Sequence, residues 1–176
     1  MQVIGVTGQL GMGKDVLADR LVERLNAVGT GCSADKAVWT RGAFANAVKD
    51  LLCDAFGGDG FRQIRGNIWI EIALRDQSKN LILSDSRYIN EARAVKQKGG
   101  MMIVMYRPGF LNDDPNPSES QIRPIVEWCL KTQKDGPIVV DPAQVVPDGI
   151  ENYDLFITNS GTIEDLHEKI DRIVVP

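Results

Sequence analysis

The chain has 176 residues, a hydrophobic content of 43% and a net charge of −4. This size predicts one compact domain over residues 1–176, and the acidic balance argues against a general nucleic-acid binder, which is usually basic. The apolar runs are much shorter than the roughly 20 residues that cross a bilayer, so no membrane association is expected. No basic stretch precedes an apolar run near the N-terminus, so no signal peptide is expected and the sequence predicts a cytoplasmic protein.

Cysteine and histidine usage excludes several kinds of site. The three cysteines, Cys32, Cys53 and Cys129, match no zinc spacing, and reduced thiols are expected. The single histidine, His167, falls in an expected surface helix, which disfavours a Ser-His-Asp or Cys-His centre and excludes a site with several histidines. Phosphoryl transfer stays open, because it depends mainly on positioning and charge neutralisation.

Short apolar runs alternate with longer amphipathic stretches, a pattern typical of β-α units. In chain order the expected elements are strand 2–7, helix 14–26, strand 36–41, helix 44–56, helix 61–75, strand 80–84, helix 90–98, strand 101–106, helix 118–131, strand 153–158 and a final helix from 162. Loops are expected at 108–117 and 135–151, the second with a short strand at 138–140. Asn90, Ser118 and Thr162 are expected to cap helices. The predicted fold class is α/β, a doubly wound, mainly five-stranded parallel sheet flanked by helices.

The sharpest motif lies between the first strand and the first helix, where residues 8–15 read GQLGMGKD. This fits G-x-x-x-x-G-K, in which glycines let backbone N–H groups converge on phosphate oxygens and the lysine places an ammonium group on them. The helix that begins there adds the positive end of its dipole. The candidate nucleotide-binding residues are Gly8, Gly11, Met12, Gly13, Lys14, Asp15 and Val16.

Two carboxylates are candidate Mg²⁺ ligands. Asp15 stands where a Ser or Thr usually follows the P-loop lysine, and Asp85 follows a buried strand at the edge where α/β sheets bind ligands. Asp85 is also a candidate catalytic residue that would orient the acceptor phosphate. The alternatives are an acidic residue stabilised by the helix dipole for Asp15, and a loop or cap carboxylate for Asp85.

Several cations are candidates for phosphate contacts, because a guanidinium pairs well with phosphate oxygens. Arg87 and Arg107 follow two expected strands and are candidate catalytic residues beside Lys14, with structural salt bridges as the alternative. Arg62 and Arg65 share one face of an expected helix, where a solvated face is the alternative. The full set of candidate substrate-binding residues is Arg41, Lys49, Arg62, Arg65 and Arg87.

These segments together resemble the deoxynucleoside monophosphate kinases of tailed bacteriophages. Residues 8–15 resemble the P-loop of that family, in which Asp also follows the lysine, and residues 43–49 (AFANAVK) resemble its Phe-Ala-x-x-Leu-Lys segment. Residues 85–92 (DSRYINEA) are similar to its Asp-x-Arg-Phe-x-Asn-Glu-Ala segment. The Gly99-Gly100 turn, Arg107-Pro108, Ser118-Glu119 and the stretch 154–166 are also similar.

The resemblance implies a nucleoside-monophosphate-kinase-like fold, ATP as donor, Mg²⁺, and a deoxynucleoside monophosphate as acceptor, in the host cytoplasm if the chain is of phage origin. Val16 and Tyr88 depart from the family pattern, and residues 108–150 match poorly apart from Ser118-Glu119. A lid or substrate-closing segment is expected within 108–150. The preferred base and the oligomeric state stay open, a homodimer being one option. The alternatives are a P-loop kinase for another small acceptor, of the phosphomevalonate or dephospho-coenzyme-A kind, and a non-catalytic nucleotide-binding module.

Overall fold

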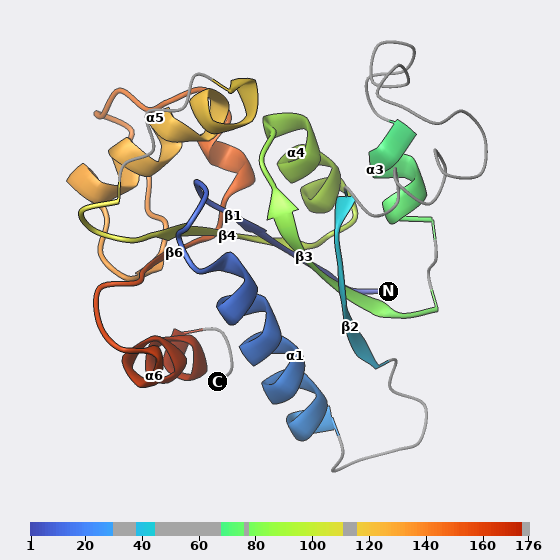
Figure 1. The fold of residues 1–176 in the computed structure, drawn as a ribbon. Coiled ribbons are helices and arrows are strands. Elements are labelled where there is room, and N and C mark those ends of the chain that lie inside the picture. The colour runs from blue at the N-terminus through green and yellow to red at the C-terminus, as the bar shows by residue number, and fades with distance from the viewer. Residues whose placement is uncertain (30–37, 45–67, 76–77, 111–115, 174–176) are drawn as a thin grey trace.

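A six-stranded sheet forms the centre of the computed structural model, which describes residues 1–29, 38–44, 68–75, 78–110 and 116–173 (Figure 1). The strands are β1 (Val3–Thr7), β2 (Trp39–Gly42), β3 (Asn80–Ser86), β4 (Met101–Tyr106), β5 (Gly136–Pro137) and β6 (Leu155–Thr158). They lie in the order β2-β3-β1-β4-β6-β5, and all neighbours are parallel except β5, which runs antiparallel to β6. The predicted α/β fold with five parallel strands is confirmed, and β5 adds a short strand at one edge.

Helices cover both faces of this sheet (Figure 1). One face carries α1 (Lys14–Gly29) and α6 (Ile163–Ile173), and the other carries α3 (Ile68–Ala73), α4 (Ile89–Gln97) and α5 (Pro117–Thr132). A short 3-10 turn, Ile150–Asn152, precedes β6. Side chains alternate between the two faces along each strand: Ile103 and Met105 pack toward α1, and Met102 and Val104 pack toward α4 and α5. The burial of apolar side chains on both faces explains the continuous apolar run of β4.

The strand order determines where the polar residues meet. Because β1 lies between β3 and β4, the turn after β1 is flanked by the carboxyl ends of both neighbours. Ligands of open α/β sheets bind at this edge of the sheet. The topology therefore brings the predicted P-loop, the segment after β3 and the segment after β4 into one region.

Two predicted element boundaries are wrong around β3 and α4. The strand continues to Ser86, so Asp85 lies within it and not after it, because Ser86 still pairs with Thr7 of β1. Helix α4 begins at Ile89 with Tyr88 as its N-cap residue, so Asn90 is not the cap. Glu91, the third residue of the helix, accepts the N–H of this N-cap residue at 3.0 Å, as the acidic residue of a capping box does.

Two further predictions are wrong, and one is confirmed, in the C-terminal half. Helix α5 begins at Pro117, so Ser118 lies in its first turn and is not the N-cap. The short strand lies at Gly136–Pro137 and not at 138–140, although the Ile138 N–H still bonds to the Asp154 carbonyl oxygen at 2.8 Å. Thr162 caps α6 as predicted: its Oγ1 accepts the Asp165 N–H at 3.2 Å, and Asp165 accepts the Thr162 N–H at 2.8 Å.

Parts of the predicted elements lie outside the described residues. These are residues 45–56 of the first predicted helix after β2, residues 61–67 of the next one, and the start of the strand expected at 36–41. Lys49, Arg62 and Arg65 lie there as well, as do Cys32 and Cys53. Within the described ranges, no helix is both long and apolar enough to cross a membrane.

Candidate phosphate-binding site

The predicted P-loop forms the turn between β1 and α1, and its glycines are required by its shape. Gly8, Gly11 and Gly13 have φ angles of 149°, 80° and 93°, a region that other residues rarely adopt. A Cβ atom on Gly8 would lie 2.4 Å from the Met105 carbonyl oxygen, and one on Gly13 would lie 2.7 Å from Asn159 Nδ2. The turn therefore packs tightly on the ends of β4 and β6, and its N–H groups lead into the start of α1.

Lys14 curls back over this turn. Its side chain is largely buried, with 8% of the residue exposed, and its Nζ donates a hydrogen bond to the Gln9 carbonyl oxygen at 2.7 Å. Burial, helped by the nearby Arg87 cation, lowers the pKa of Lys14 from 10.5 to about 8, against the opposing effect of three carboxylates. These carboxylates belong to Glu119, Asp15 and Asp85. Lys14 is therefore mostly a cation at neutral pH, in a place that favours the arrival of negative charge.

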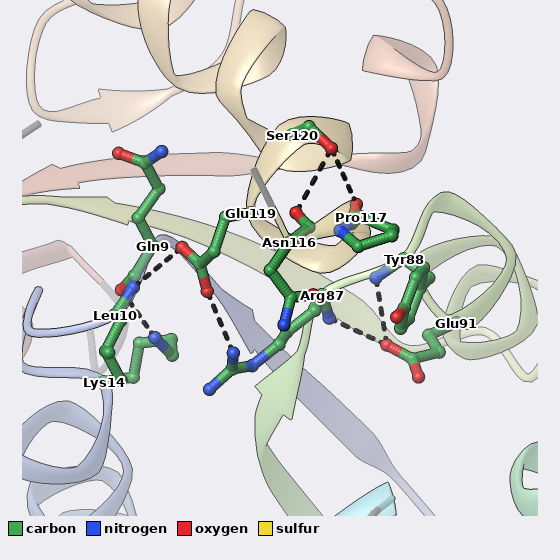
Figure 2. A network of polar contacts seen from close by, with 10 residues as sticks. All are labelled: Gln9, Leu10, Lys14, Arg87, Tyr88, Glu91, Asn116, Pro117, Glu119 and Ser120. Carbon is green, nitrogen blue, oxygen red and sulfur yellow. Dashed lines mark hydrogen bonds and ion pairs between the residues drawn. The ribbon is translucent and has the colours of Figure 1, made fainter. Parts of the chain in front are cut away.

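Arg87 reaches this region from the segment after β3, where Glu119 of α5 holds it. Arg87 Nη1 donates to Glu119 Oε1 at 2.9 Å, and the N–H of Leu10 donates to Glu119 Oε2 at 3.0 Å (Figure 2). The Glu119 side chain is 3% exposed, whereas 33% of the Arg87 side chain is exposed. One buried carboxylate therefore connects Arg87 to the P-loop backbone.

A second buried carboxylate, Glu91, shapes the chain just after β3. Its Oε2 accepts the N–H groups of Arg87 at 2.7 Å and Tyr88 at 3.0 Å (Figure 2), and its Oε1 accepts Trp69 Nε1 at 3.1 Å. Burial raises the pKa of Glu91, although the bonds from the two backbone N–H groups oppose that effect. Glu91 thus fixes the backbone at Arg87, and Glu119 holds the guanidinium group at the end of the Arg87 side chain.

Asp15 lies in the first turn of α1 and pairs with Arg41 of β2. Its Oδ1 accepts from Arg41 Nη2 and, at 3.1 Å, from the Ser84 hydroxyl. Arg41 Nη1 also pairs with Asp19 at 3.0 Å. The Asp15 side chain is 71% exposed. Arg41, predicted to bind substrate, is thus placed beside the P-loop by a surface ion pair.

The two predicted metal ligands, Asp15 and Asp85, both already have hydrogen-bonding partners. Asp85 Oδ1 accepts the N–H of Phe44 at 2.8 Å, and Asp15 already pairs with Arg41. The described residues contain no group of three or more side chains that could hold a metal ion. Mg²⁺ in phosphate-transfer sites usually takes one or two carboxylates and completes its shell with phosphate oxygens and water. The residues therefore fit a metal shared with bound phosphates, and not one held by the protein alone.

Arg107, immediately after β4, lies against the same turn. Its N–H donates to the Met12 sulfur at 3.0 Å, and its guanidinium carbon lies 5.5 Å from the centre of the Phe110 ring. The Phe110 ring in turn rests on the P-loop, because a Cβ atom on Gly11 would lie 2.7 Å from it. Arg107 is thus near the P-loop, and its side chain packs on an aromatic ring.

Met12 and Val16, both predicted to bind nucleotide, point into the core. Met12 is fully buried, and its carbonyl oxygen accepts Asn159 Nδ2 at 3.1 Å. Val16 packs against the core on the α1 face of the sheet. Any contact of Met12 with a phosphate would therefore involve its backbone N–H and not its side chain.

The structure thus brings Lys14, Arg87 and Asp15 together around the turn, with Asp85 and Arg107 on the neighbouring strand ends. The sequence assigns no role to Glu119, which belongs only to a segment that carries the resemblance. No local pattern indicates this role, because the N–H that Glu119 accepts belongs to Leu10, 109 residues earlier in the chain. The Ser84 hydroxyl, one residue before Asp85, also went unpredicted as a partner of Asp15.

The chain was compared with family models, with curated proteins and with solved structures. No family model matches the chain. A protein of Acanthamoeba polyphaga mimivirus named "Putative deoxynucleotide monophosphate kinase" is 27% identical over 100 residues, which are 57% of this chain and 39% of the relative. The chain therefore matches well under two thirds of that relative's length. This similarity confirms the resemblance to deoxynucleotide monophosphate kinases that the sequence predicted.

Two solved structures align with nearly the whole chain. The tunicamycin resistance protein of Deinococcus radiodurans is 14% identical, with a TM-score of 0.47 and coverage of 97% of this chain and 94% of its own. The thymidylate kinase of Ehrlichia chaffeensis is 15% identical, with a TM-score of 0.48 and coverage of 97% of both chains.

Proposed function

We propose that this protein transfers the γ-phosphoryl group of ATP to a deoxynucleoside 5′-monophosphate and releases the diphosphate and ADP. The observation that carries this proposal is that Lys14 and Arg87 meet at a P-loop turn. The backbone shape of this turn requires its glycines. The mimivirus relative, by its printed name, supports a deoxynucleotide monophosphate as the acceptor.

In this proposal the donor phosphates lie in the turn 8–15. The N–H groups at the start of α1 and the positive end of its dipole favour the negative charge. Lys14 would exchange its bond to the Gln9 carbonyl oxygen for phosphate oxygens, and its pKa would rise again as the anion offsets the cost of burial. The transition state spreads charge over the transferring group, so positioned cations are the main catalytic groups.

Mg²⁺ would neutralise part of the phosphate charge when it is bound. Asp15 and Asp85 are the residues that we propose to hold it, directly or through water. Asp15 would first have to exchange its ion pair with Arg41, an exposed pair of the kind that is worth about 0–1 kcal/mol. That exchange would also release the Arg41 guanidinium toward the acceptor.

The acceptor phosphate needs no strong general base, since its oxygens are already anionic near neutral pH. Arg87 and Arg107 would neutralise charge on the transferring group, and Arg41 would contact the acceptor. Lys49, Arg62 and Arg65 belong to the same proposal as acceptor-binding residues. A segment within 108–150 would close over the site, because an open site would waste ATP by hydrolysis.

The test is ATP-dependent ADP release with Mg²⁺ across a panel of deoxynucleoside and ribonucleoside monophosphates. We expect release that depends on at least one deoxynucleoside monophosphate and that is lost in Lys14→Ala. Release that needs no acceptor would overturn the acceptor assignment. ATP binding without release on any acceptor, with phosphomevalonate and dephospho-coenzyme A included, would identify a non-catalytic nucleotide-binding protein.

A further inference from the structure

A buried carboxylate lies at the centre of the network in Figure 2 and has no place in the mechanism above. Glu119 projects from the first turn of α5 and is 3% exposed. Burial of a carboxylate costs several kcal/mol unless its oxygens are paired. Both oxygens of Glu119 are paired, one with a cation of the phosphate site and one with the backbone of the P-loop.

The backbone partner is one particular peptide group. The N–H of Leu10 donates to Glu119, and the carbonyl oxygen of Gln9, which belongs to the same peptide group, accepts from Lys14 Nζ at 2.7 Å. A trans peptide directs its N–H and C=O to opposite sides. The Gln9–Leu10 peptide is therefore held from both sides, by an ammonium group on its oxygen and a carboxylate on its nitrogen.

This contact falls on the part of the loop that precedes the start of α1. The N–H groups at the beginning of α1, which have no partner within the helix, follow four residues later. Glu119 thus holds the turn at Leu10 and leaves the N–H groups at the start of α1 available to an incoming anion. When phosphates draw Lys14 away from Gln9, the bond from Leu10 to Glu119 still fixes this peptide.

The other oxygen of Glu119 determines the position of Arg87. A guanidinium carries five N–H donors, and Glu119 accepts from Nη1. The Arg87 side chain is one-third exposed, so a ligand can reach it while Glu119 holds Nη1. Glu91 meanwhile fixes the Arg87 backbone N–H at 2.7 Å, so this arginine is held at both ends by buried carboxylates.

We propose that Glu119 is a positioning residue: its carboxylate ties the Arg87 guanidinium to the Gln9–Leu10 peptide and thereby fixes Arg87 relative to the P-loop. This inference rests on the proposed function, because it assigns Arg87 to the phosphates bound there. Displacement of a catalytic group by about 1 Å can cost a factor of about 100 in rate, so loss of the tie should lower turnover more than it lowers binding.

The test compares Glu119→Gln, which keeps the shape and removes the charge, with Glu127→Gln on the same helix. Glu127 pairs with Arg123 at 2.8 Å, but its side chain is 39% exposed. We expect Glu119→Gln to lower kcat at least about tenfold while KM for ATP changes less than about threefold. Glu127→Gln should match the wild type in both.

A double-mutant cycle shows whether Glu119 acts through Arg87. In an Arg87→Met background, Glu119→Gln should change kcat by less than about twofold, because the group that it positions is gone. A full additional loss in that background would show a merely structural role and would overturn the proposal. Equal kcat in Glu119→Gln and the wild type would overturn it as well.

Two measurements keep this inference separate from the proposed function. Calorimetric titration of the wild type with ATP must first show binding; if it does not, the proposed function has failed and not the role of Glu119. In the ligand-free protein, the ¹⁵N–¹H signals of the Arg87 guanidinium, assigned by their loss in Arg87→Met, should shift in Glu119→Gln and not in Glu127→Gln. Unshifted signals would overturn the tie without reference to activity, and Glu119→Asp, which keeps the charge, provides the same readout if Glu119→Gln does not fold.

Discussion

Replacement of the P-loop lysine should make the fold more stable while it removes function. Lys14 is a largely buried cation, and burial with Arg87 nearby lowers its pKa from 10.5 to about 8. At about 1.4 kcal/mol for each pH unit, this difference costs about 3 kcal/mol of folding free energy at pH 7. Lys14→Met removes that cost and loses the hydrogen bond to the Gln9 carbonyl oxygen, which is worth about 1 kcal/mol. The expected net gain is about 2 kcal/mol.

The gain in stability of Lys14→Met should depend on pH in a characteristic way. Because the pKa of Lys14 is lower in the folded than in the unfolded state, the folded protein binds fewer protons between about pH 8 and 10.5. Its free energy of unfolding should therefore rise with pH across that interval. Lys14→Met lacks this rise, so its advantage should be full at pH 7 and should shrink as the pH approaches 10.5.

Urea unfolding of both proteins at pH 7 and pH 10 measures the effect directly. At pH 7, a gain of about 2 kcal/mol corresponds to a rise in Tm of about 4–8 °C for a chain of this size. Lys131→Met, which removes an exposed lysine of α5, serves as the matched control and should change little. A Lys14→Met protein less stable than the wild type at pH 7, or one whose advantage does not depend on pH, would refute this reasoning.

Three further outcomes are expected. Lys14→Ala should lower turnover about 100- to 1,000-fold with the fold preserved, as circular dichroism would check, and near-normal turnover would exclude the lysine from catalysis. Asp15→Ala should raise the Mg²⁺ concentration needed for half-maximal activity several-fold; an unchanged Mg²⁺ titration would leave Asp15 only its ion pair with Arg41. Burial raises the pKa of Asp135, but hydrogen bonds from Lys169 and Thr158 outweigh it and hold the pKa below its ordinary value. Because Asp135→Asn weakens these hydrogen bonds, it should cost about 1 kcal/mol in urea unfolding at pH 7. The difference should fade as the pH falls below about 3.9, through the lowered pKa of the folded state; a variant as stable as the wild type at pH 7, or a difference that persists well below pH 3.9, would contradict this prediction.

The sequence predicts what is contiguous along the chain. The P-loop is eight consecutive residues whose glycines, lysine and flanking elements all follow from one local pattern, and the structure reproduces it with the expected backbone. The positions of Arg87 and Arg107 were predictable in the same way, because parallel topology places the residues that follow β3 and β4 on either side of the turn after β1. The end of β3 differs from the expectation, because the strand continues past residue 84 and includes the polar residue Asp85.

The sequence does not predict which carboxylate pairs with which cation. The pattern at 118–121 is that of a capping box, yet Pro117 begins the helix, and Glu119 turns to the P-loop instead of its own helix end. In the same way, Asn90 has a good capping side chain, but the helix begins one residue earlier, with Tyr88 as its N-cap residue and Glu91 accepting the Tyr88 N–H. Several neighbouring residues could begin each helix, and the choice among them depends on tertiary packing.

These pairings make it easier for Arg41 than for Arg87 to leave its position beside the P-loop. Arg41 pairs with Asp15 and Asp19, whose side chains are well exposed, so water can replace either partner at little cost. Arg87 pairs with Glu119, which is buried, and release of that carboxylate would leave an unpaired charge in the interior. An incoming phosphate can therefore draw Arg41 away from its partners, whereas it must meet Arg87 where Glu119 holds it. On this reasoning the site combines one fixed arginine with one that can follow the ligand.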